Sequence, residues 1–148
     1  MLDASHAGHG PSLAKFDWED PLGLRATLSE VMTPEAYAHM EAGAARLEAG
    51  LAAAIARAGA PWHVVRVGAR VEFICAPGPL RNGTEAGAAH QPALEAVIHT
   101  CLLNRGCLIA PFHNMMLVSP VTTMKQVDRL IAAFDATLAL LFGPDEAQ

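Results

Sequence analysis

The sequence predicts an α+β domain with two layers, a mainly antiparallel four-stranded sheet and helices on one face of that sheet. Four segments carry apolar residues at steps of three and four, which is typical of amphipathic helices. Four shorter apolar runs, bounded by Gly, Pro or polar residues, are typical of strands. The order is helix, helix, strand, strand, helix, strand, strand, helix, and it favours helices packed over one sheet face.

The length of 148 residues corresponds to one domain, which is large enough to bury a core. Residues 1–19 contain Gly and Pro without an apolar period, and we expect them to form a mobile N-terminal arm. Residues 20–148 then form the domain.

The mean hydropathy of +0.26 is high for a chain of this size, which suggests that one surface of the protein meets another surface.

Both helices at the start of the domain begin with a capping residue followed by proline. Asp20-Pro21 begins the first, which ends near Met32, and Thr33-Pro34 begins the second. The second helix ends at Gly59, since glycine readily takes the left-handed conformation that follows a helix. Its apolar stripe consists of Tyr37, Met40, Ala44, Leu47, Leu51, Ile55 and Ala58.

A hairpin is predicted after the second helix. Its strands are Trp62–Val67 and Arg70–Ala76, with Gly68-Ala69 as the tight turn between them. Residues 80–90 are polar and contain Gly, so we expect a loop there. The apolar residues that share one face of the second strand are Val71, Phe73 and Cys75.

A third helix is expected from Pro92 to the stop signal at Gly106. The two remaining strands are predicted at Cys107–Ala110 and Met115–Val118, on either side of a loop at Pro111–Asn114. Apolar strands that present a polar and aromatic loop are a common way to hold a few side chains toward a ligand.

The last helix begins with a capping box, in which Thr123 and Gln126 satisfy each other's backbone N–H groups. Its apolar face recurs at helical spacing, and Gly143-Pro144 ends it.

Charge and composition argue against several classes of partner and location. The net charge is −5 and the ten Lys and Arg residues form no basic run, so a nucleic-acid partner is not expected. No run of about 18 apolar residues predicts a membrane-spanning helix, and no signal peptide is visible at the N-terminus. Three cysteines without close pairing fit reduced thiols in a cytoplasmic protein.

Histidine and cysteine spacing gives no metal or redox motif. The seven histidines are scattered, and the closest two, His6 and His9, lie in the predicted arm. No HExxH or CxxC pattern occurs, so a metal site is not predicted. Cys101 and Cys107 fit small buried apolar residues better than a redox pair.

Arg81 is the candidate for binding a substrate carboxylate, because a guanidinium in a loop can donate two parallel hydrogen bonds to such a group. The alternative is that Arg81 is solvated or has a structural role.

The chain has only two lysines, Lys15 and Lys125, and neither follows a strand in a pocket-forming context. There is no Gly-rich phosphate cradle either. The residues alone therefore assemble no complete active site.

Four segments occur in an order that resembles one enzyme family. They are Leu24–Tyr37, Val67–Arg70, Leu103–Pro111 and residues 118–129. This ordered set is similar to the C-terminal part of class III aminotransferases, which are pyridoxal-phosphate enzymes of fold type I. The branch with the greatest similarity is that of the glutamate-1-semialdehyde aminomutases. The resemblance covers about residues 20–142.

The resemblance implies the small domain of a much larger enzyme. In that family the large domain carries the cofactor lysine, the phosphate-binding turn and the Asp that pairs with the pyridine nitrogen. Pyridoxal phosphate would then belong to the parent family and not be bound by this chain alone. The small domain closes over the active site, and the resemblance makes Phe112, His113 and Asn114 its substrate-facing loop. The acidic residue that aminomutases often place in this loop is absent, so the amino donor is left open.

Two functional hypotheses follow. The first is the C-terminal part of a class III transaminase, which acts on an amino acid or amine, needs a large-domain or homodimer partner, and is inactive alone. The second is a stand-alone α+β ligand-binding or dimerisation module without enzymatic activity, which the high apolar content also fits.

Overall fold

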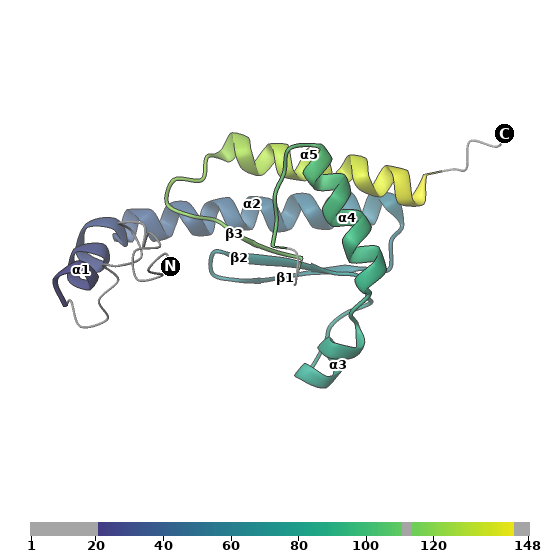
Figure 1. Ribbon diagram of the computed structural model, residues 1–148, viewed down its shortest axis with the longest axis horizontal. Coiled ribbons are helices and arrows are strands. Elements are labelled where there is room, and N and C mark those ends of the chain that lie inside the picture. Colours follow the sequence, from purple (N-terminus) through teal and green to yellow (C-terminus); the bar gives the residue numbers. More distant parts are fainter. Residues whose placement is uncertain (1–20, 111–113, 144–148) are drawn as a thin grey trace, which may run out of the picture.

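Two long helices lie side by side on one face of a small antiparallel sheet (Figure 1). The computed structural model describes residues 21–110 and 114–143. The helices are α2 (Pro34–Ala58) and α5 (Met124–Phe142). They run in the same direction, since Arg46 pairs with Asp128 and, further along both helices, Arg57 pairs with Asp135.

The caps of α2 and α5 confirm the predicted helix ends. The Thr33 side chain accepts a hydrogen bond from the Ala36 N–H, and Gly59 ends α2 with φ at +64°. Thr123 and Gln126 form the complete capping box of α5. The residues of α2 that are buried against the sheet and α5 are Met40, Gly43, Ala44, Leu47, Leu51, Ala54 and Ile55.

The first predicted helix is present but does not pack on the core. It consists of α1 (Pro21–Ala26), which continues into a short π-helix, η2 (Thr27–Val31). Its apolar stripe is uncovered, because Leu24, Leu28 and Val31 are each more than half exposed. The segment lies beyond the N-terminal end of α2 (Figure 1).

The sheet has the strand order β1-β2-β3 in the described part of the chain. β1 (His63–Val67) and β2 (Arg70–Ile74) form the predicted hairpin, and Gly68 in its turn has φ at +56°. β3 (Met115–Leu117) pairs antiparallel with the other edge of β2. Three residues of β2 and its end are buried under the helices, as predicted: Val71, Phe73 and Cys75.

The described residues contain three strands, so the predicted four-stranded sheet is not confirmed. Cys107–Ala110 takes no regular structure. Instead, Gly106 turns the chain with φ at +73°, and the Cys107 N–H donates to the Leu102 carbonyl at the helix end. Cys107 and Ile109 then insert side chains into the core, so the apolar run reflects burial and not strand pairing.

A second correction concerns residues 80–90, which were expected to be a loop. They contain the short helix α3 (Gly83–Ala88), capped by the Asn82 side chain, which accepts from the Glu85 N–H at 3.0 Å. The next helix, α4 (Pro92–Asn104), begins at Pro92 as predicted and buries Ile98 and Leu102.

The core lies between the sheet and the two long helices. Phe73 of β2 contacts Phe134 of α5 with ring centroids 4.8 Å apart, and both rings are buried. Trp62, just before β1, stacks near Phe73 and meets Phe142 edge-on at 5.3 Å. These aromatic contacts fix the end of the sheet against the last turn of α5.

Some predictions fall outside the described residues. These are the N-terminal arm at residues 1–19, the capping residue Asp20, the loop residues Pro111, Phe112 and His113, and Pro144 after the last helix. Within the described ranges, none of the helices combines the length and apolarity that a bilayer crossing requires.

Candidate functional site

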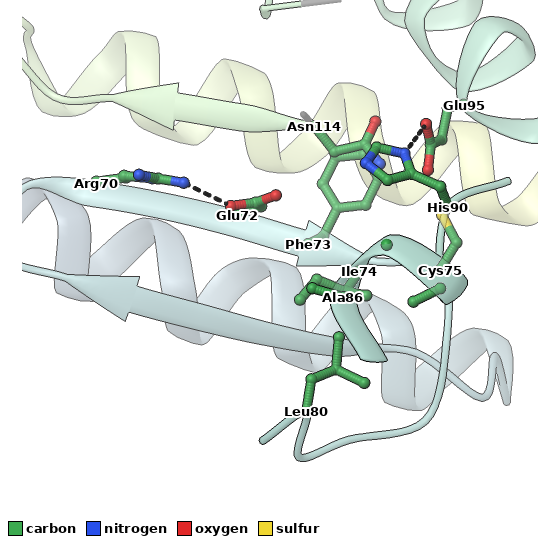
Figure 2. Close-up of a pocket in the computed structure, with 12 residues that line it drawn as sticks. Arg70, Glu72, Phe73, Ile74, Cys75, Leu80, Ala86, His90, Glu95 and Asn114 are labelled. Carbon is green, nitrogen blue, oxygen red and sulfur yellow. Dashed lines mark hydrogen bonds and ion pairs between the residues drawn. The ribbon is translucent and has the colours of Figure 1, made fainter. Parts of the chain in front are cut away.

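A pocket of about 330 Å³ lies where β2 ends, next to the predicted substrate-facing loop (Figure 2). Its walls come from three parts of the chain that are distant in sequence: β2 and its end, the segment from Leu80 to Glu95, and Asn114. The residues with side chains in its wall include Arg70, Glu72, Phe73, Ile74, Cys75, Leu80, Ala86, His90, Glu95 and Asn114.

The segment between β2 and α4 is held by hydrogen bonds from its polar residues. Glu85 accepts from the backbone N–H of Arg81 at 2.7 Å, which closes the turn before α3. Glu95, in the first turn of α4, accepts from the backbone N–H of Gln91 at 3.1 Å. The Gln91 side chain donates to the Cys75 carbonyl and joins this segment to the end of β2.

An ion pair and a histidine–carboxylate hydrogen bond lie on opposite sides of the pocket (Figure 2). Arg70 donates to Glu72 at 3.0 Å, with the Glu72 side chain only 21% exposed. His90 Nδ1 and Glu95 Oε2 are 3.2 Å apart on the other side. Both pairs offer polar atoms to a ligand that enters between them, at the cost of displacing an existing partner.

The Cys75 thiol at the pocket wall is not a nucleophile in this structure. Burial, together with the negative charge of Glu95, raises its pKa to about 12. A thiol with such a pKa remains protonated at neutral pH, and the thiolate is the reactive form. Cys75 therefore acts as an apolar wall residue.

Asn114 is the predicted site residue that the structure places in the pocket. Its side chain is directed into the space near Phe73 and His90 (Figure 2), and the residue is only 7% exposed. Its φ of +48° lies in the left-handed region, which Asn tolerates better than most residues. This backbone conformation sets the direction in which the chain enters β3.

The structure does not bring Arg81 into the pocket wall with Asn114. Arg81 is exposed, whereas its neighbour Leu80 lines the pocket. Its role in binding a carboxylate therefore stays a prediction. Phe112 and His113 lie outside the described residues, so their roles also stay predictions.

Four charged or polar residues of the pocket were not predicted as site residues: Arg70, Glu72, His90 and Glu95. The alternation of β2 does place Arg70 and Glu72 on one face, opposite the buried side chains, and this was the available signal. No local pattern connects them with His90 or Glu95, because the fold alone brings these segments together.

The described residues do not fit a covalent site for pyridoxal phosphate. Such a site needs a lysine amine in the pocket. Lys125, the one lysine in the described ranges, lies exposed in the first turn of α5 and does not line the pocket. Within the same ranges, no three His, Cys, Asp or Glu side chains gather as metal ligands.

Comparison with known proteins gives a consistent set of relatives, although no protein-family model matches the chain. The glutamate-1-semialdehyde 2,1-aminomutase of Desulfosudis oleivorans is 33% identical over 115 residues, which are 77% of this chain and 27% of that protein. A crystal structure of a glutamate-1-semialdehyde aminomutase from Pseudomonas aeruginosa, in complex with PMP, is 46% identical with a TM-score of 0.76. It matches 78% of this chain and 26% of that chain.

The chain is a homologue of the pyridoxal-phosphate-dependent transaminases. A further similar structure is the β-phenylalanine aminotransferase of Variovorax paradoxus, at 25% identity and a TM-score of 0.68, covering 77% of this chain and 26% of that one. The matched region of these enzymes is a C-terminal small domain. This chain spans about a quarter of the length of the transaminases that it matches.

Proposed function

We propose that the chain acts as the small domain of a pyridoxal-phosphate-dependent transaminase of the class III, fold type I group. Such an enzyme transfers an amino group between an amino acid or amine and a keto or aldehyde acceptor. The observation that carries the proposal is the 46% identity to the Pseudomonas aminomutase over 78% of the chain. The TM-score of 0.76 for the same pair supports a shared fold over the matched region.

In this proposal the chain supplies substrate contacts, and a separate large domain supplies the cofactor site. Phe112, His113 and Asn114 face the substrate, and Arg81 is the candidate for its carboxylate. The position of Asn114 in a pocket wall supports this assignment. The exposed position of Lys125 supports a cofactor site on another part of the enzyme.

The same proposal makes the chain inactive alone and places it in the cytoplasm. Its length corresponds to only about a quarter of the matched transaminases. Its three cysteines are all unpaired, which supports a reducing compartment.

The proposal is tested with two proteins assayed side by side. One is the 148-residue chain with added pyridoxal phosphate. The other is a chimera, in which this chain's matching segment replaces the matched quarter of the Pseudomonas aminomutase. Each is given an amine donor and a keto-acid acceptor, and the amino product is measured by chromatography.

We expect amino transfer by the chimera and none by the chain alone. The unmodified Pseudomonas enzyme serves as the positive control. A chimera that folds and retains the cofactor without any amino transfer would contradict the proposed function. Turnover by the 148-residue chain alone would contradict the assignment of the cofactor site to a separate domain.

A further inference from the structure

The side chain of Asn114 is a buried polar group that has no hydrogen-bond partner within the described part of the chain. The residue is only 7% exposed, and Figure 2 shows its carboxamide directed into the pocket at the end of β2. Buried polar groups in folded proteins almost always have a partner, because burying one unpaired costs free energy. An unpaired carboxamide in a pocket wall therefore indicates that a polar group of a ligand completes the site.

The charged residues of the same wall favour a cation as that group. With His90 uncharged, the wall carries one guanidinium, that of Arg70, and two carboxylates, those of Glu72 and Glu95. One negative charge is left over, and it is poorly screened because the Glu72 and Glu95 side chains are only 21% and 12% exposed. A carboxylate that entered this pocket would meet like charge, whereas an ammonium would meet opposite charge.

The negative charge of Glu95 already acts on a neighbouring group in this wall. Burial, and then the charge of Glu95, raise the pKa of the Cys75 thiol to about 12. A charge that disfavours a thiolate at this wall favours a cation beside it. This effect agrees with the sign that the geometry of the pocket favours.

Acceptor oxygens are available for such a cation. Glu72 uses its Oε2 to accept from Arg70, and its Oε1 has no partner in the described ranges. Asn114 adds the oxygen of its carboxamide. A primary ammonium has three N–H donors and no acceptor, so it is complementary to a wall that offers unpaired oxygens.

The rest of the pocket suits the carbon chain that would carry the ammonium. Phe73, Ile74 and Leu80 give the wall apolar surface, and the volume of about 330 Å³ is that of a small ligand pocket. Asn114 directly follows Phe112 and His113 in the sequence, the residues that face the substrate in the proposed function. The pocket is therefore next to the proposed substrate position.

We propose that this pocket binds a primary ammonium group, and that it selects amine donors that carry a second ammonium at the far end of a short carbon chain. This inference rests on the proposed function and specifies the class of donor. Asn114 and Glu72 accept hydrogen bonds from the ammonium, and the charge of Glu95 stabilises it.

The first test is an NMR titration of the isotope-labelled full chain with 1,4-diaminobutane, followed at the side-chain amide signal of Asn114. The uncharged 1,4-butanediol and the doubly negative butanedioate are compared at the same ionic strength. We expect the diamine to shift the Asn114 signal with an affinity at least about tenfold higher than that of the diol, because hydrogen bonds to an ionised donor are the stronger ones. Butanedioate should bind more weakly than the diamine.

Glu72→Gln keeps the shape of the side chain and removes its charge, so it should weaken diamine binding by about tenfold. Glu95→Gln, whose amide oxygen can still accept from the start of α4, is the second variant and should weaken binding as well. Glu41→Gln, at an exposed carboxylate of α2, is the control and should bind the diamine as the unmodified chain does. Equal binding of diamine and diol, or unchanged diamine binding in both pocket variants, would overturn the inference.

The second test compares 1,4-diaminobutane with butylamine as amino donors of the Pseudomonas chimera. We expect a kcat/KM about tenfold higher for the diamine, and a ratio that falls toward one with Glu72→Gln. Turnover of both amines without preference would overturn the inference and leave the proposed function standing. Diamine binding at Asn114 without amino transfer from either amine would contradict the proposed function and support the ammonium site.

Discussion

Asn114 combines a left-handed backbone with a buried side chain at the pocket wall. For most L-residues the left-handed conformation costs about 1–2 kcal/mol, whereas Asn and Gly take it readily. We expect Asn114→Ala to lower the free energy of unfolding by about 1–2 kcal/mol, mainly through this strain. Asn114→Gly is the matched control, and it should lose less than half as much.

Urea unfolding followed by circular dichroism measures both variants. Equal losses for the alanine and glycine variants would show that the amide contacts, and not the backbone conformation, make Asn114 important. In that case the geometric argument for its position in the site would fail.

At the scale of elements, α2 and α5 approach each other closely at Gly50. A Cβ added there would meet both branches of the Ile131 side chain, with Cγ1 at 2.7 Å and Cγ2 at 2.9 Å. Overpacking of this kind costs about 1–3 kcal/mol, while replacing a helical Gly with Ala recovers about 1 kcal/mol. We therefore expect Gly50→Ala to destabilise the protein by about 1 kcal/mol.

Gly87→Ala in α3 is the control, because a Cβ there meets no atom within 4 Å. It should be neutral or stabilising by up to about 1 kcal/mol. Thermal unfolding of the two variants compares them directly. If Gly50→Ala matched or exceeded the stability of Gly87→Ala, the close packing of α2 on α5 would be incorrect.

The elements that the sequence predicts well are those with local signals at both ends. Thr33 and Gly59 mark α2, and the capping box at Thr123 marks α5. The short helix α3 was missed because it has no apolar stripe, although Asn82 and Glu85 carry a capping signal three residues apart. At Cys107–Ala110 an apolar run predicts burial correctly but not a strand, since local sequence does not show whether a neighbouring strand edge is available.

The candidate site was predictable only in part. The apolar runs on either side of Asn114 predicted only a loop, and the resemblance to the aminotransferases is what made Asn114 a substrate-facing residue. Arg70 and Glu95 meet in the same pocket only because β2, α4 and the start of β3 converge there. Such convergence depends on tertiary packing, and neither the spacing of apolar residues nor the capping residues of a helix predict which distant segments pack together.

At the scale of the whole molecule, the pocket lies at the sheet, and its wall combines Arg70 and Glu72 of β2 with Asn114 at the start of β3. This pocket and the match to about a quarter of larger transaminases support the same account. The chain is proposed to provide substrate contacts to an active site whose cofactor is held by another domain. The mean hydropathy of +0.26 agrees with a surface that is covered in the working enzyme.

The most direct test of that account is the KM for the amine donor in the Pseudomonas chimera with Phe112→Ala or His113→Ala. We expect a several-fold higher KM in each variant, with unchanged cofactor content, because the proposed role of Phe112 and His113 is to contact substrate and not cofactor. Tyr37→Ala, at a half-exposed aromatic residue of α2, is the control and should leave the KM unchanged. Equal KM values for the Phe112, His113 and Tyr37 variants would contradict the account.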